Sequence, residues 1–312
     1  MSVNAMRFGG LAMLGLAATA GSLLSVGPSA SVAQSGTPVD PYSDLPAEMT
    51  LTGIVRDFKE RSVDGGHTDF ELRPAGGFGH YMNNIAPTLD ADKKPVFQGG
   101  GKKVSRQWRT SANQNIHPTL FNEALGDVAG AYSGNADPGA ITSGTSFSQW
   151  YRDVPGVNMS RELTLTLRRQ ANSNMYVFDD RQDSLYSSRG GFFPINNELF
   201  GNSRNETKNF HFTFELSTEF VYKPNTGQTF TFIGDDDVWV FINDQLVIDL
   251  GGVHSAINQT VFLDRLTFLN ANSKNTLRVF HAERHRTQSN FKIETTINLK
   301  NAELPNSSSM YD

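Results

Sequence analysis

The 312-residue chain contains no cysteine, which excludes disulfide bonds, lipidated cysteines and a cysteine nucleophile. Its stability must therefore come from a hydrophobic core, which a chain of this length is able to build. Charge is also sparse, since charged residues make up 19% of the chain and the formal net charge is −5. Proteins that bind nucleic acid need basic patches, so this balance argues against nucleic acid and against electrostatic docking on anionic membranes.

Several sequence signatures are absent as well. The chain has no G-x-S-x-G nucleophile elbow, no phosphate-binding P-loop, no G-x-G-x-x-G after a predicted strand and no EF-hand loop. Beyond the N-terminus, no segment approaches the ~20 apolar residues needed to span a bilayer. Asp and Glu are plentiful enough for a glycosidase carboxylate pair, but no sequence feature locates one.

The N-terminal residues 1–33 have the features of a secretory signal peptide. Arg7 precedes an apolar stretch over residues 11–26, and Ser31 and Ala33 occupy the −3 and −1 positions of a cleavage site. A short N-terminal anchor helix is the alternative. We expect cleavage after Ala33, which removes one Arg and leaves 26 basic and 32 acidic residues, a formal charge of −6. The mature protein is then secreted or held at the cell surface, without a transmembrane segment.

The rest of the chain is rich in Gly and aromatic residues, with 22 Phe. We divide it into a linker over 34–47, one domain over 48–300 whose N-terminal half is loop-rich, and a flexible tail over 301–312. In the C-terminal half, short alternating apolar runs recur at intervals of about 8–12 residues, separated by Gly, Asn, Asp and Ser. This pattern is typical of an antiparallel β-sandwich. The predicted strands cover residues 49–58, 161–170, 209–222, 228–234, 237–243, 245–252, 259–269, 275–285 and 290–299.

Smaller features complete this prediction. Residues 118–126 have Pro118 at the start and Gly126 near the end of a possible short helix. Asn243 and Asp244 separate two runs and indicate a hairpin turn. Trp239 lies within a predicted strand, where a tryptophan more often belongs to the core than to a sugar-stacking surface.

Three consecutive carboxylates, Asp235, Asp236 and Asp237, lie between two predicted strands. Adjacent like charges repel, so they point together only where a cation offsets the repulsion. Ca²⁺ suits such a turn because it takes six to eight oxygen ligands at ~2.3–2.6 Å. A polar turn with solvated acids is the alternative reading of the same residues.

The stretches TFIGDDDVWVFINDQLVIDLGGVH and RVFHAERHRTQSNFKIET resemble the C-terminal signature of the fibro-slime family. That signature belongs to the wider PA14-type β-sandwiches. Upstream, LTGIVRDF, HTDFEL, KKPVF and FSQWYRDVPGVN resemble the N-terminal half of the same family, so the likeness extends over about residues 49–299. Thr68 stands where we expect Pro. The resemblance implies an all-β, PA14-like antiparallel sandwich with an elaborated, loop-rich N-terminal half.

The resemblance also implies a non-catalytic surface or matrix module that binds carbohydrate. PA14-type adhesins hold Ca²⁺ between two neighbouring aspartates joined by a cis peptide, and sugar hydroxyls complete the coordination. By their place before the VWVFIN strand, those aspartates correspond to Asp235 and Asp236. A second adhesin loop contributes an asparagine, which corresponds to Asn290. We therefore expect calcium ligands at Asp235, Asp236, Asp237 and Asn290, and carbohydrate contacts at Asp235, Asp236, His254, Glu283 and His285.

A different function follows if residues 278–285 are extended. His281, Glu283 and His285 then share one face, two residues apart, while Arg284 and Arg286 lie on the other. Two imidazoles and a carboxylate make a ligand set for catalytic Zn²⁺ or non-haem iron, so the alternative is a metal-dependent enzyme acting on polysaccharide. A purely structural surface protein is the third possibility.

Overall fold

The structure is a computed structural model that describes residues 40–302. The predicted signal peptide, the start of the linker and nearly all of the predicted tail lie outside these residues. Of the described residues, no helix is long and apolar enough to cross a membrane.

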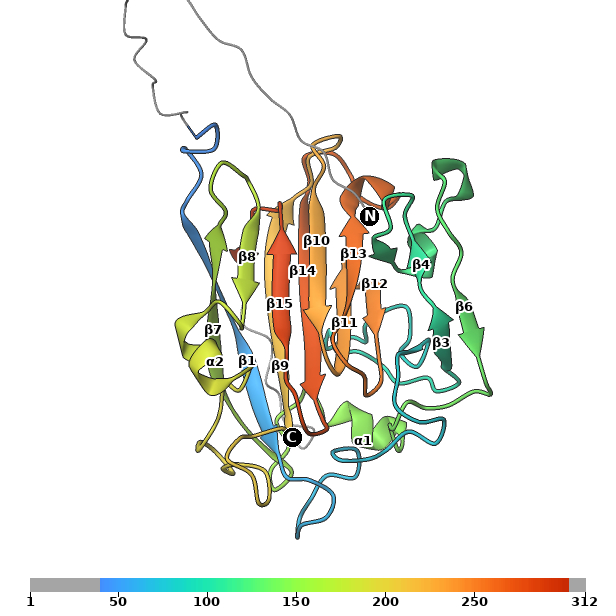
Figure 1. Cartoon of the computed structure of the whole chain (residues 1–312), viewed down its shortest axis with the longest axis vertical. Helices are drawn as coiled ribbons and strands as arrows, with labels where there is room; N and C mark the ends of the chain where they lie inside the picture. The colour runs from blue at the N-terminus through green and yellow to red at the C-terminus, as the bar shows by residue number, and fades with distance from the viewer. Residues whose placement is uncertain (1–39, 303–312) are drawn as a thin grey trace, which may run out of the picture. The chain divides into compact units, whose positions relative to one another are not determined.

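Short β-strands dominate the described residues (Figure 1). The strands are β1 (Glu48–Phe58), β2 (Tyr81–Met82), β3 (Lys102–Arg106), β4 (Trp108–Arg109), β5 (Asn115–Ile116), β6 (Ala131–Ser133), β7 (Asn158–Arg169), β8 (Tyr176–Asp179), β9 (Phe212–Val221), β10 (Thr229–Gly234), β11 (Asp237–Ile242), β12 (Gln245–Leu250), β13 (Ile257–Phe262), β14 (Lys274–Glu283), β15 (Phe291–Thr295) and β16 (Lys300–Asn301). The helices are α1 (Gly144–Ser148), α2 (Ser184–Arg189) and the 3₁₀ turns η1 (Pro118–Leu120), η2 (Glu123–Leu125) and η3 (Leu263–Arg265).

The main sheet is antiparallel throughout and folds over on itself. Its strand order is β12-β11-β14-β9-β1-β7-β8-β15-β10-β13, with β16 paired to β9. Strands β7 and β8 pair over only two residue pairs, Arg168 with Val177 and Arg169 with Tyr176. The strands from β12 to β7 form one layer and those from β8 to β13 form the other (Figure 1). The predicted all-β antiparallel sandwich is confirmed.

The space between the two layers holds the larger hydrophobic core. Phe214 of β9 and Val240 of β11 meet Phe232 of β10 and Ile293 of β15 in one cluster of buried side chains. Successive residues of a strand point to opposite faces, so alternate apolar residues are enough to line this core. The alternation that predicted the strands thus determines which side chains face inward.

Strand β11 departs from alternation, because all six of its residues are buried. Val238, Val240 and Ile242 face the core between the layers, whereas Trp239 and Phe241 belong to a second apolar cluster on the outer face. The second cluster also contains residues of the segment between β1 and β7: Phe70, Ile85, Ile141, Phe147, Trp150 and Tyr151. A strand covered on both faces takes a continuous apolar run. The prediction that Trp239 is a core residue is confirmed.

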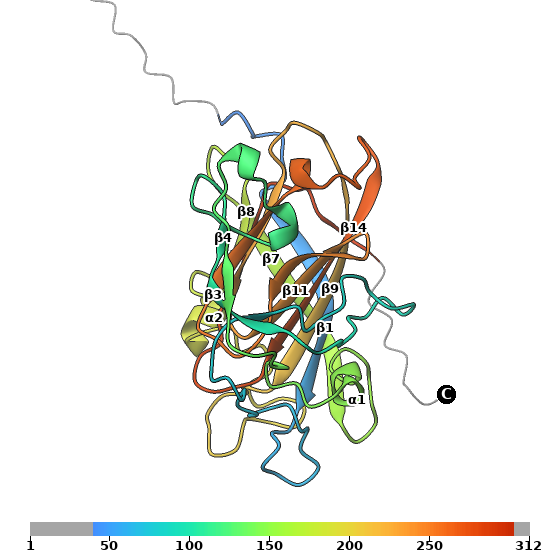
Figure 2. The same cartoon turned by 90° about the vertical axis from the view of Figure 1, so that its right-hand side faces the viewer.

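The segment between β1 and β7 has little regular structure of its own. It carries a three-stranded sheet, β2-β3-β6, and the pair β4-β5. An antiparallel bridge from Tyr81 to Gly251 attaches β2 beyond the end of β12. Figure 1 places β3, β4 and β6 on the side of β12, and in the turned view of Figure 2 this side faces the reader. The segment therefore covers both an outer face and an edge of the sandwich.

Two local predictions meet different outcomes. The predicted hairpin is present, with Asn243 and Asp244 at φ of 48° and 64° between β11 and β12. The predicted helix over residues 118–126 is instead two 3₁₀ turns, η1 and η2, with Gly126 ending the second at φ 74°. Asn122, between the turns, is extended and its side chain caps η2, which interrupts a continuous helix.

Candidate functional site

The turn from β10 to β11 carries the chain from one layer of the sandwich to the other. Gly234 is the last residue of β10 and Asp237 is the first of β11, so Asp235 and Asp236 form the crossing itself. The peptide bond between Asp235 and Asp236 is cis, as the resemblance implied. The carbonyl oxygen of Asp235 accepts a hydrogen bond from Nε2 of His281, at 2.9 Å, which holds the turn against β14.

Asp235 and Asp236 line a pocket of about 170 Å³ at this end of the sandwich. Three further segments reach it: the loop before β2, the loop after β12 and the loop between β14 and β15. Its remaining lining residues are Phe78, Val253, His254, Ser255, His285, Arg286, Thr287 and Gln288. Asp235 and Asp236 thus share a hollow with the loop that follows β14.

Both carboxylates are almost fully buried, with 3% of Asp235 and 4% of Asp236 exposed. The main chain and side-chain amides of Asn290 donate to Asp235, at 2.5 and 2.7 Å. The main-chain amides of His254 and Arg284 donate to Asp236, at 3.1 and 3.3 Å. Burial raises the pKa of Asp235 above its ordinary value and raises that of Asp236 well above it. No salt bridge to either acid occurs among residues 40–302.

Asp237, the third acid, points away from this pair. Its carboxylate accepts Nε of Arg284 at 2.5 Å and the main-chain amide of Gly252 at 2.6 Å, and neither charged side chain is exposed. In the described residues, no group of three or more His, Cys, Asp or Glu side chains is arranged to hold a metal ion. The prediction of Asp237 as a calcium ligand is wrong, because alternation along β11 directs it to the outer face, where Arg284 neutralises it.

Glu283 is completely buried and does not line the pocket. Neither of its carboxylate oxygens has a hydrogen-bond partner among the described residues. The Ser289 hydroxyl, which lies nearby, donates instead to the Phe192 carbonyl. Burial raises the pKa of Glu283 well above its ordinary value, and the charges of Asp236 and Asp235 act in the same direction. The prediction of a direct sugar contact at Glu283 is wrong, since the side chain lies beneath the site.

The histidines of the alternative metal site are separated from one another. His281 lies among core aromatic rings, donates through Nε2 to a carbonyl, and has a pKa lowered by burial to about 4. His285 lies beyond β14 and donates through Nδ1 to the Arg286 carbonyl at 2.7 Å. The set of His281, Glu283 and His285 therefore does not form the predicted metal site, because packing places its members in different environments.

Asn290 lies beside Asp235 but does not present an oxygen to the pocket. Its side-chain nitrogen donates to the Asp235 carboxylate, and its side-chain oxygen accepts Nη2 of Arg181 at 2.8 Å. A donor on one side and a carboxylate on the other fix the orientation of the amide. The prediction of Asn290 as a side-chain calcium ligand does not fit this arrangement. The residue instead positions Asp235.

His254 and His285 line the pocket, and their contact with carbohydrate stays a prediction. The ring nitrogens of His254 lie 2.9 Å from the Ser255 carbonyl and 3.1 Å from the Leu250 carbonyl, which fixes the ring. About a fifth of the His285 side chain is exposed, and its Nε2 is 3.5 Å from Glu71.

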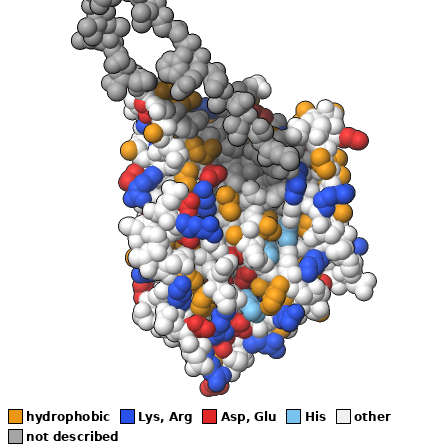
Figure 3. Space-filling model, viewed as in Figure 1, with side chains coloured by type: hydrophobic (Ala, Val, Ile, Leu, Met, Phe, Trp, Pro, Cys, Tyr) orange, Lys and Arg blue, Asp and Glu red, His pale blue; other side chains and the backbone are white. Residues whose placement is uncertain are grey.

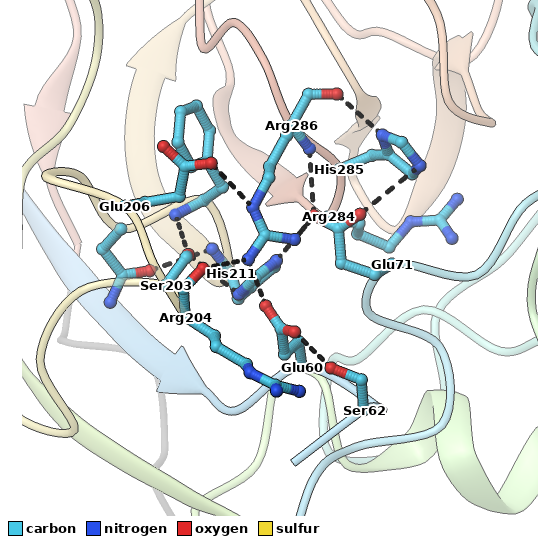
Figure 4. A network of polar contacts seen from close by, with 12 residues as sticks. Glu60, Ser62, Glu71, Ser203, Arg204, Glu206, His211, Arg284, His285 and Arg286 are labelled. Atoms are coloured by element: carbon cyan, nitrogen blue, oxygen red, sulfur yellow. Dashed lines mark hydrogen bonds and ion pairs between the residues drawn. The ribbon is translucent and has the colours of Figure 1, made fainter.

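The loop between β14 and β15 is anchored by a second acidic cluster, which no sequence pattern predicted (Figure 4). The guanidinium of Arg286 pairs with Glu60, with Glu71 at 2.8 Å and with Glu206 at 3.3 Å. Glu71 also accepts from His211 at 2.9 Å. These residues come from three loops far apart in sequence, so no motif connects them. Each acid of this cluster forms a salt bridge, whereas Asp235 and Asp236 form none with residues 40–302.

Comparison with known proteins agrees with the all-β fold. Residues 194–308 match the family model of the PA14 domain. This range contains the acidic turn, β11 and the loop after β14. The described chain is thus an all-β sandwich whose C-terminal part is similar to the PA14 domain.

Particular relatives are found in Dictyostelium discoideum. The chain is 36% identical over 201 residues to protein psiR, covering 62% of the chain and 20% of psiR, and 38% identical over 243 residues to protein psiD, covering 74% of the chain and 39% of psiD. It therefore corresponds to well under half the length of these relatives. Among solved structures, the PA14 domain of the antifreeze protein MpAFP matches 33% of this chain and 56% of its own, at 9% identity and a TM-score of 0.22.

Proposed function

We propose that this chain is an exported, calcium-dependent module of the fibro-slime type that binds carbohydrate or matrix glycans and has no catalytic role. The observation that carries the proposal is the pair of adjacent, buried carboxylates, Asp235 and Asp236, which face a pocket and form no salt bridge with any residue of the range 40–302. The PA14 match over residues 194–308 supports a carbohydrate-binding or adhesion role.

The residues present fit a calcium ion. Two adjacent buried charges cost several kcal/mol each in effective desolvation unless a counter-charge lies close to them. Each carboxylate oxygen has two lone pairs and accepts one amide hydrogen in the structure, which leaves capacity for a cation. Asp235 and Asp236 would hold the ion, and Glu283 adds a third buried acid beneath them. When bound, Ca²⁺ supplies coordination positions that oxygen ligands such as vicinal hydroxyls can occupy.

The surrounding residues hold the two carboxylates in place, and the size of the pocket limits which ligands fit. Asn290 fixes Asp235, the main chain of His254 fixes Asp236, and the Arg286 cluster fixes the loop on the other side of the pocket. At about 170 Å³ the pocket is smaller than the ~300–1,000 Å³ of sites that enclose a drug-sized molecule. We therefore expect one terminal sugar residue to bind weakly, with avidity from several displayed copies.

A glycan array tests this function with the secreted, full-length protein. Wild type is probed with Ca²⁺ and with a chelator, beside Asp236→Asn and a control, Asp44→Asn, which changes an exposed acid outside the pocket. We expect glycan binding that is lost with the chelator and in Asp236→Asn but is kept in Asp44→Asn. Binding that ignores both the chelator and Asp236→Asn contradicts the proposal.

A further inference from the structure

A large exposed apolar side chain stands at the rim of the same pocket. Phe78 is 44% exposed, although it belongs to the segment that otherwise covers the sandwich. Apolar side chains are scattered over the face seen in Figure 3, and a lone one needs no explanation. This one shares a pocket with two buried acids, and pockets that bind small molecules combine apolar or aromatic walls with a few placed polar groups.

The backbone fixes Phe78 relative to the acids. The amide of Gly79 donates to the carbonyl of Val253 at 2.8 Å, and the amide of the next residue, His254, donates to Asp236. The flanking glycines have φ of 79° at Gly77 and 152° at Gly79, and residues other than glycine rarely adopt these values. The aromatic ring is thus presented on a tight turn that is hydrogen-bonded to the loop holding Asp236.

The ring also has defined neighbours. His285 meets it edge-on, with centroids 4.8 Å apart, and the guanidinium of Arg73 lies 5.0 Å from its centroid. These contacts restrict the ring without covering it, since nearly half of the side chain stays exposed. A restricted aromatic ring loses little conformational entropy when a ligand packs on it.

We propose that Phe78 is the platform on which a bound pyranose stacks its C–H face while its hydroxyls turn toward Asp235 and Asp236. This inference rests on the proposed function and adds a ligand class, cyclic sugars with an uninterrupted apolar face. Acyclic polyols carry the same vicinal hydroxyls but offer no such face, so Phe78 distinguishes the two classes.

Calorimetry and proton NMR on the full-length protein with Ca²⁺ test this role. The probes are the methyl pyranosides of glucose, galactose and mannose, with erythritol as the acyclic polyol. For a pyranoside that wild type binds, we expect Phe78→Ala to weaken binding about 2- to 13-fold, in line with the energy of an aromatic contact. Phe78→Tyr should keep the affinity, and calcium affinity should not change in either variant. Sugar C–H resonances should shift upfield with wild type and with Phe78→Tyr only.

Two control variants separate aromatic stacking from a general loss of apolar surface. Leu125→Ala removes another large exposed apolar side chain that does not line the pocket, and it should bind as wild type does. Phe78→Leu keeps apolar bulk without the aromatic face, so full affinity in this variant overturns stacking. Equal pyranoside affinity in wild type and Phe78→Ala overturns the inference and leaves the calcium-dependent function standing. If wild type binds no pyranoside with Ca²⁺, the proposed function fails and the inference fails with it.

Discussion

Asp237 and the pair Asp235–Asp236 are neighbours in sequence, yet their surroundings differ completely. Asp237 faces the outer side of β11, where the guanidinium of Arg284 lies 2.5 Å away and both side chains are sealed from solvent. Asp235 and Asp236 face a pocket, and only neutral amides donate to them. Arg284 thus pairs directly with Asp237, whereas neither Asp235 nor Asp236 forms a salt bridge with a described residue.

This difference separates structural acids from candidate binding acids. Removing one partner of a buried salt bridge destabilises the fold strongly. A buried carboxylate without a salt bridge costs folding free energy, and such groups are found most often at functional sites. The Arg286 cluster belongs with Asp237, since Glu60, Glu71 and Glu206 all have a basic partner. Burial alone would not have distinguished these groups, because both contain acids that are largely inaccessible.

The largest expected effect comes from breaking the buried salt bridge between Arg284 and Asp237. Arg284→Met leaves Asp237 buried without a counter-charge and removes donors to the carbonyls of Gly139 and Ala140. We expect a loss of about 3–5 kcal/mol in the free energy of unfolding, measured by urea denaturation. Arg168→Met, which breaks a pair with both side chains more than half exposed, should cost under about 1 kcal/mol. Similar losses in the two variants would contradict the assignment of Arg284.

Asp249 extends the comparison to a buried acid that has hydrogen bonds but no cation. It accepts from Nε1 of Trp239 and from the amide of Asn83, and burial raises its pKa to about 7. The folded state therefore holds this proton more tightly than the unfolded state, so stability is lost as pH rises from about 4 to about 7.

Comparison with Asp249→Asn isolates this effect. Relative to the variant, wild type should lose about 3 kcal/mol in the free energy of unfolding over that range, given ~1.4 kcal/mol per pK unit. The measurement is a series of urea titrations from pH 4.5 to 7.5. A constant difference between the two proteins across this range would show that Asp249 does not titrate as described.

Calcium should stabilise the folded protein by offsetting the charges of Asp235 and Asp236. Free Ca²⁺ at 100 times its dissociation constant should stabilise wild type by about 2.7 kcal/mol, because only the folded state holds the complete site. Asp236→Asn removes one carboxylate, so it should lose most of this gain and be no less stable than wild type in chelator. Thermal unfolding with and without Ca²⁺ checks both expectations. Equal stabilisation of the two proteins would place calcium elsewhere.

A smaller effect is expected in the Arg286 cluster, whose side chains are partly exposed. Arg286→Gln should cost about 1–2 kcal/mol, because solvent screens these pairs more than the pair of Asp237. Amide hydrogen exchange should accelerate in residues 284–290 and remain unchanged in β9. Uniform acceleration across the sandwich would instead show that the cluster supports the whole fold.

Much of the fold was predictable because it depends on local patterns. Alternation located the strands of the C-terminal half, and Asn243 and Asp244 marked a hairpin that the structure contains. The segment between β1 and β7 has weak periodicity, so its small sheets and α1 were not predicted. One signal was available: the apolar run VWVFI has no polar face, which indicates a strand covered on both sides.

Some residues of the site were predictable from the sequence, and others were not. Adjacent acids between two strands are visible in a sequence, so Asp235 and Asp236 were found. The burial of Glu283, the orientation of the Asn290 amide and the presence of Phe78 depend on which distant loops meet. Arg181, Phe192 and Glu71 contact the loop between β14 and β15, and they lie 97 to 215 positions before their partners along the chain.

By itself, the sequence determined the strand pattern, the position of the acidic turn and the lack of any disulfide, because each of these depends on residues close together in the chain. Only the tertiary structure decided which of three consecutive acids receives an internal cation. The physical reason is that a charge responds to everything within a few ångströms, and most of what surrounds this turn comes from remote loops.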